Sequence, residues 1–108
     1  MKGKINEVEC KGNVYEVSNE RLSQIEKALE NAEDTIRERQ EERLEERYEH
    51  MKEEAEERTR QAYKALHGAA LDSVVSKALK DLRQTLEAEA EDAVQMELED
   101  LKESLLNE

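Results

Sequence analysis

The chain has 108 residues, no Phe, Trp or Pro, and 43% charged against 36% hydrophobic residues, with a net charge of −12. So few large apolar side chains exclude a two-layer globular domain and are typical of long helices that bury a narrow stripe. The excess of carboxylates argues against direct binding to nucleic acid or to an anionic membrane, because phosphate contacts need a surface of Lys and Arg.

Residues 1–18 are predicted to form a β-hairpin, with its strands within 4–17. Gly12 and Asn13 offer a two-residue turn with glycine first, as in a type II′ hairpin. The opposed pairs would be Lys11 with Val14, Cys10 with Tyr15, Glu9 with Glu16, and Val8 with Val17. This register gathers the apolar residues Val8, Cys10, Tyr15 and Val17 on one face. Because an isolated hairpin is only marginally stable, we expect that face to cover the first helix or a second chain.

A long helix is predicted over residues 19–67, with Ser18 or Asn19 as its N-cap and its end at Leu66 or His67. Its first part carries apolar residues at alternating spacings of three and four, typical of a coiled-coil seam: Leu22, Ile25, Leu29, Ala32 and Ile36. Beyond Ile36, steps of four pass Gln40 to reach Leu44 and Tyr48. That drift resembles an eleven-residue repeat and would locally straighten or reverse the supercoil.

Charge pairs at i,i+4 are expected to support the thinly apolar middle of this helix. The pairs are Glu33–Arg37, Glu54–Arg58 and Glu56–Arg60. Each would add a few tenths of a kcal/mol to helix stability. The stretch can therefore stay helical while it buries little surface.

Gly68 is predicted to end the first helix as its C′ residue, within a turn over residues 68–72. Asp72 or Ser73 would cap a second helix, residues 73–108, whose apolar stripe is Val75, Ala78/Leu79, Leu82, Leu86, Ala90, Ala93/Val94, Leu98, Leu101 and Leu105. Two architectures remain open. Either the second helix folds back along about residues 33–66, which we favour, or Gly68 is a soft spot in one continuous rod.

The expected fold class is therefore mainly α: one structural domain with an N-terminal β-hairpin and two long helices in an antiparallel coiled-coil hairpin. The fold-back would leave residues 19–32 projecting beside the hairpin. The residues predicted to close a dimer or bind a partner are Val8, Tyr15, Val17, Leu22, Ile25 and Leu29. Because the stripes are too long and thin for one chain to cover, a homodimer or higher oligomer is the expected closure.

An acidic face is predicted on the second helix. It comprises Glu87, Glu91, Asp92, Glu99, Asp100 and Glu103. Carboxylates on a rigid helix can imitate the phosphates of a duplex and capture the basic surface of a nucleic-acid-handling protein, aided by electrostatic steering. Three functions are thus carried forward: a homo-oligomeric interaction and assembly protein first, an acidic inhibitor or nucleic-acid mimic second, and an assembly scaffold or chaperone third.

No pattern for catalysis, cofactor binding or metal binding is present. His50 shares a helix face with Glu46 and Glu54, but no Glu stands three residues before either His, as bundle di-metal sites require. The single Cys10 has no His near it in sequence to activate it and fits a reducing compartment. No apolar run resembles a secretory signal or a membrane span. We expect a non-enzymatic, cytoplasmic protein.

Overall fold

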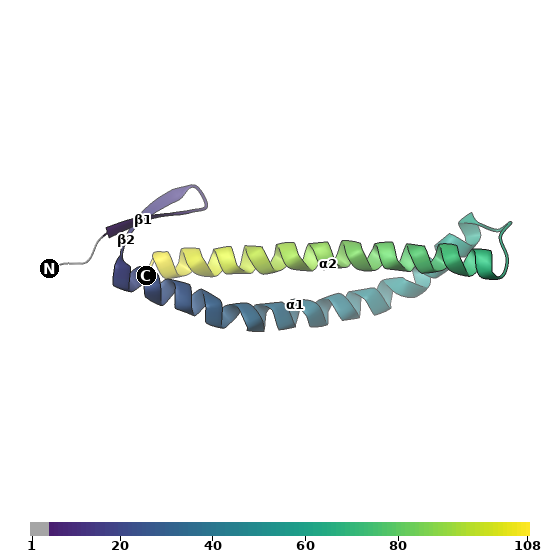
Figure 1. Cartoon of the computed structure of the whole chain (residues 1–108), viewed down its shortest axis with the longest axis horizontal. Helices are drawn as coiled ribbons and strands as arrows, with labels where there is room; N and C mark the ends of the chain where they lie inside the picture. Colours follow the sequence, from purple (N-terminus) through teal and green to yellow (C-terminus); the bar gives the residue numbers. More distant parts are fainter. Residues whose placement is uncertain (1–4) are drawn as a thin grey trace. The chain divides into compact units, whose positions relative to one another are not determined.

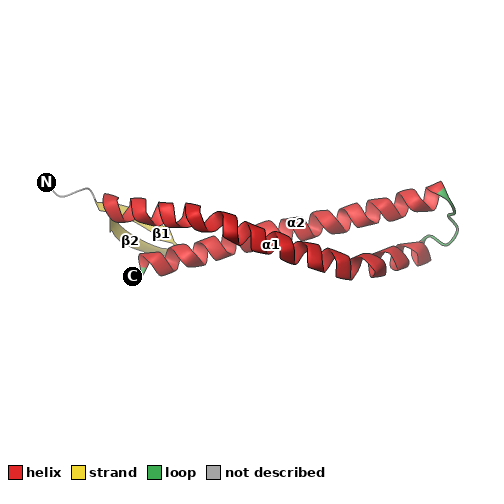
Figure 2. Cartoon of the chain, turned by 90° about the horizontal axis from the view of Figure 1, so that it is seen from below, coloured by secondary structure: helices red, strands yellow, loops and turns green. Residues whose placement is uncertain are grey.

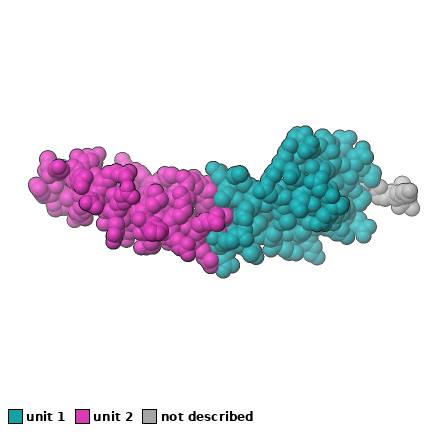
Figure 3. Space-filling view, turned by 180° about the vertical axis from the view of Figure 1, so that it is seen from behind, with its two compact units in different colours: residues 1–39, 92–108 teal, residues 40–91 magenta. Residues whose placement is uncertain are grey.

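The computed structural model describes residues 5–108. Two strands, β1 (Ile5–Cys10) and β2 (Asn13–Ser18), are followed by two helices, α1 (Asn19–Ala62) and α2 (Ala69–Leu106) (Figure 1). The prediction of a mainly helical chain that begins with a hairpin is confirmed. By compactness the chain divides into two units, coloured separately in Figure 3: unit 1 spans Met1–Arg39 and Asp92–Glu108, and unit 2 spans Gln40–Glu91.

The hairpin turn lies one residue earlier than predicted. Lys11 (φ 51°) and Gly12 (φ 80°) form the turn, and two successive positive φ angles correspond to type I′ rather than type II′. The opposed pairs are Ile5–Ser18, Asn6–Val17, Glu7–Glu16, Val8–Tyr15, Glu9–Val14 and Cys10–Asn13. Moving a two-residue turn by one position changes the register by two, so side chains keep their faces. The predicted apolar face therefore survives although the predicted pairs do not.

Ser18 is the N-cap of α1. Its Oγ accepts a hydrogen bond from the backbone N–H of Arg21 at 3.2 Å, which satisfies one of the free donors of the first turn. Glu20 adds a negative charge in that turn, where the helix dipole favours it. The start of α1 thus follows from local chemistry that the sequence displays.

The connection between the helices differs from the prediction at both ends. Instead of continuing to Leu66 or His67, α1 ends at Ala62, and a tight turn follows in which Leu66 N–H donates to the Tyr63 carbonyl at 3.0 Å. Gly68, at φ 58°, opens α2 rather than closing α1, since its carbonyl accepts the first helical bond from Asp72 N–H at 3.0 Å. Residues 69–71, predicted as linker, are therefore helical, and Asp72 lies in the first turn instead of capping it.

The fold-back alternative is correct, and the continuous rod is wrong. The helix is interrupted between Ala62 and Ala69, and α2 runs back beside α1 in both ribbon views (Figures 1 and 2). The earlier turn and the longer α2 bring its last residues beside the first turn of α1, where Arg21 Nη2 donates to the Leu105 carbonyl at 2.8 Å. The prediction that residues 19–32 project without a partner helix is therefore wrong.

Each unit has its own small core. In unit 1 the buried residues are Cys10, Val17, Ile25, Ile36 and Val94, and in unit 2 they are Gln40, Leu44, Val75 and Leu86. Ile36, Gln40 and Leu44 are all buried, so the buried stripe of α1 continues beyond Ile36 in steps of four, as predicted. The charge pairs Glu33–Arg37 (3.2 Å) and Glu54–Arg58 (2.5 Å) are present, whereas the predicted Glu56–Arg60 pair is not formed among the described residues.

Candidate functional site

The hairpin presents its apolar face to the helices of unit 1. Cys10 is 1% exposed on β1 and Ile25 is 1% exposed on α1. Of the six residues predicted to bind a partner, two are buried and four are half-buried: Val17 and Ile25, and Val8, Tyr15, Leu22 and Leu29. The structure thus brings them together in one unit, where they contribute to the chain's own core, and only the four half-buried residues keep part of their surface open.

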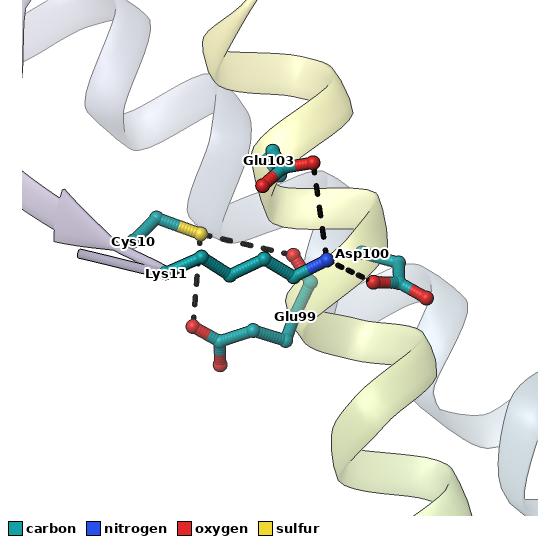
Figure 4. A network of polar contacts seen from close by, with 5 residues as sticks. All are labelled: Cys10, Lys11, Glu99, Asp100 and Glu103. Carbon is teal, nitrogen blue, oxygen red and sulfur yellow. Dashed lines mark hydrogen bonds and ion pairs between the residues drawn. The ribbon is translucent and has the colours of Figure 1, made fainter. Parts of the chain in front are cut away.

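Cys10 faces α2. Its Sγ lies 3.6 Å from Glu99 Oε1 and 3.8 Å from the Glu99 carbonyl oxygen, toward which the thiol donates (Figure 4). Burial raises the pKa of the Cys10 thiol, and the hydrogen bond to the Glu99 carboxylate raises it further. A thiol held neutral in this way is a poor nucleophile, so Cys10 has a packing role in this arrangement.

Lys11 connects the hairpin turn to α2 through ion pairs. Its ammonium group pairs with Asp100 and lies 3.8 Å from Glu103 (Figure 4). The hydrogen bond to Asp100 raises the pKa of Lys11, with the nearby Glu103 carboxylate adding to the effect. Three members of the predicted acidic face, Glu99, Asp100 and Glu103, therefore contact the chain's own hairpin.

The other three acidic residues divide between the units. In unit 2, Glu87 accepts a hydrogen bond from Arg83 at 3.3 Å, and Glu91 is exposed. In unit 1, Asp92 is exposed and forms no hydrogen bond or ion pair with any residue in 5–108. Asp92 is thus available to an external cation.

Arg83 joins the two helices of unit 2 and was not singled out from the sequence. It forms a two-pronged pair with the carboxylate of Glu45, with Nη1 at 3.1 Å from Oε2, and its guanidinium lies 5.2 Å from the centre of the Tyr48 ring. The pKa of Glu45 is lowered by its hydrogen bond with Arg83, whose own pKa is raised by the same bond. Arg47 and Glu89 add a second interhelical pair at 2.7 Å. These pairs could only be found once the fold-back register was known.

Among residues 5–108, five large apolar side chains are exposed, and four of them lie outside the apolar stripes predicted from the sequence. Met96 is 68% exposed, Ile5 and Val14 are each 63%, Tyr63 is 48%, and Met51, predicted on the helix stripe, is 40%. Ile5 and Val14 share the outer face of the hairpin but are separated there by the Glu7–Glu16 pair. They do not form a continuous patch.

The His, Cys, Asp and Glu side chains of residues 5–108 form no metal centre. His50 lines an open groove of unit 2 with Glu45, Glu46 and Glu49. Across that described range, no group of three or more His, Cys, Asp or Glu side chains is arranged to hold a metal ion. Over the same residues, no helix combines the length and the apolar character that crossing a membrane demands.

Comparisons with protein-family models, with curated proteins and with solved structures find no significant match to this chain.

Proposed function

We propose that this chain is a non-enzymatic, homo-oligomeric interaction protein whose paired helices assemble with further helices through their leucine-bearing faces. One observation carries the proposal. Of the twelve leucines, only Leu44 and Leu86 are buried, and the other ten are half-buried: Leu22, Leu29, Leu66, Leu71, Leu79, Leu82, Leu98, Leu101, Leu105 and Leu106.

The physical reason lies in the number of helices. Two paired helices cover one stripe on each other, and side chains that flank the stripe keep part of their surface in water. Each square ångström of apolar surface removed from water contributes roughly 25 cal/mol, so a second pair of helices gains free energy by covering the flanks. A four-helix bundle made of two helical hairpins, with coiled-coil-like packing, is a common way to do so.

Sedimentation equilibrium at tens of micromolar tests the proposal, and we expect a dimer or larger oligomer. Leu22→Gln and Leu106→Gln, at half-buried positions, should weaken association while the helix content measured by circular dichroism is retained. A matched control is Glu20→Gln, which changes an exposed residue of the same helix end. A wild-type chain that sediments as a monomer throughout this range would refute the proposal.

The acidic inhibitor is the second candidate, supported by the net charge of −12 and by exposed carboxylates such as Asp92 on a rigid helix. Three carboxylates of the predicted acidic face, Glu99, Asp100 and Glu103, already contact Cys10 and Lys11 of the same chain. Because they are less available to a basic partner, this candidate comes second. It predicts salt-dependent binding to a basic protein, with loss on charge reversal at Asp92. An assembly scaffold or chaperone remains the third candidate, and in that case the leucine faces rather than the carboxylates would bind.

A further inference from the structure

The helix-to-helix connection in unit 2 is positively charged, whereas the chain as a whole is negatively charged. Residues 58–71, here called the tip, contain Arg58, Arg60, Lys64 and His67 and no Asp or Glu, in a chain of net charge −12. At physiological salt, interactions between exposed charges are screened beyond about 8 Å. A docking partner therefore interacts with the local cations of the tip rather than with the net charge of the chain.

Two of these cations have no partner among residues 5–108. Arg58 pairs with Glu54 at 2.5 Å, whereas Arg60 and Lys64 form no ion pair with any described residue. Both side chains are exposed. They are therefore available to carboxylates outside the molecule.

The tip also exposes apolar surface. Tyr63 is 48% exposed, and Ala62, Ala65, Ala69 and Ala70 are exposed around the turn. Tyr and Arg are enriched at the energetically important centres of protein interfaces. Small alanines beside a tyrosine allow a second backbone to come close.

The complementary surface is the C-terminal part of α2. Residues 87–108 contain nine Asp or Glu and one Lys. Within this segment Met96, 68% exposed, stands one helical turn after the unpaired Asp92. At an i,i+4 spacing in α2, the exposed Asp92 carboxylate and the exposed Met96 side chain lie on the same helix face.

We propose that the tip of one copy docks on residues 87–108 of a second copy, with Arg60 and Lys64 facing carboxylates that include Asp92. In the proposed dimer the contact is reciprocal: the tip of each copy docks on residues 87–108 of the other, which closes the assembly with two-fold symmetry. This inference rests on the proposed self-association and adds to it the orientation of the partners and the charges that select it.

The test is charge reversal in the full chain, read by sedimentation equilibrium. Arg60→Glu with Lys64→Glu should weaken the dimer by about tenfold or more, as expected when rim charges turn repulsive. The control, Lys27→Glu with Arg43→Glu, changes two exposed cations outside the tip and gives the same net charge. It should leave association within about threefold of wild type, since surface charges away from an interface contribute little.

A mixing experiment then tests the orientation. Asp92→Lys alone should also weaken the dimer. Mixing the tip variant with Asp92→Lys should restore association, because one contact then pairs glutamates with the new lysine and the other pairs two wild-type surfaces. Circular dichroism of each variant should match wild type, because every changed residue is exposed.

The outcomes separate the two proposals. If the wild type is a dimer, three results would overturn the docking of the tip and leave the homo-oligomer intact. The tip variant could associate as strongly as wild type, the control variant could lose as much affinity as the tip variant, or mixing could fail to restore association. A wild-type monomer would overturn both.

Discussion

Arg21, in the first turn of α1, contacts the last turn of α2. Its Nη2 donates a hydrogen bond to the Leu105 carbonyl at 2.8 Å and lies 3.2 Å from the Glu108 carboxylate. The last carbonyls of a helix have no partner within the helix, so a guanidinium there acts as a C-cap and also meets the negative end of the helix dipole.

Arg21→Ala should therefore fray the end of α2. We expect a loss of about 0.5 kcal/mol in unfolding free energy, at the low end for such contacts because the Arg21 side chain is 36% exposed. Amide hydrogen exchange should accelerate in the last turn of α2 and stay unchanged in unit 2. Lys27→Ala, at an exposed position of α1, is the control. Equal protection in both variants would show that Arg21 does not cap the helix.

Gly12→Ala should destabilise the hairpin. Gly12 has φ 80° and a Cβ added there would meet nothing within 4 Å, so the cost is one of backbone conformation, about 1 kcal/mol. Urea unfolding of the variant would measure it. Asn13→Ala, in β2, should cost clearly less, because in the observed type I′ turn that residue no longer needs a turn conformation. A cost of Gly12→Ala no larger than that of Asn13→Ala would contradict the positive φ of Gly12.

The Lys11–Asp100 pair should make stability depend on pH in the alkaline range. The pKa of Lys11 is raised in the folded chain by Asp100 and Glu103, so its stabilisation is complete below the unfolded pKa of about 10.4 and is lost as pH rises through the folded pKa. The difference in Tm between wild type and Lys11→Gln should thus be largest near pH 8 and shrink above pH 10. A difference that stays constant over this range would contradict the assignment.

Gln40→Leu should stabilise the monomeric fold. Gln40 is 6% exposed in a seam of apolar residues, and a buried leucine adds about 1 kcal/mol after the lost polar interaction is counted. Chemical denaturation should show a higher midpoint. Since a polar residue in a seam often selects one register and one oligomeric state, sedimentation should show a broader distribution of species. Gln84→Leu, on the exposed face of α2, should change neither quantity.

The features that could be predicted from the sequence depend on residues close together along the chain. The apolar stripes of both helices, the Ser18 cap and the passage of the seam through Gln40 follow from spacing along the chain, because a helix repeats every 3.6 residues wherever it lies. The division of the hairpin into an apolar and a charged face follows in the same way from the two-residue period of a strand.

Tertiary structure decided the rest. The turn at Lys11-Gly12 and the one at Gly12-Asn13 give the same facial pattern, so only the packing of Cys10 and Lys11 against Glu99 and Asp100 distinguishes them. Residues 63–71 contain a single helix breaker, Gly68, so their sequence permits several helix ends. Where α1 stops determines how far α2 reaches, and hence that Arg21 meets Leu105 and Arg83 meets Glu45. Such contacts join residues distant along the chain, and a periodic pattern alone does not specify which of them meet.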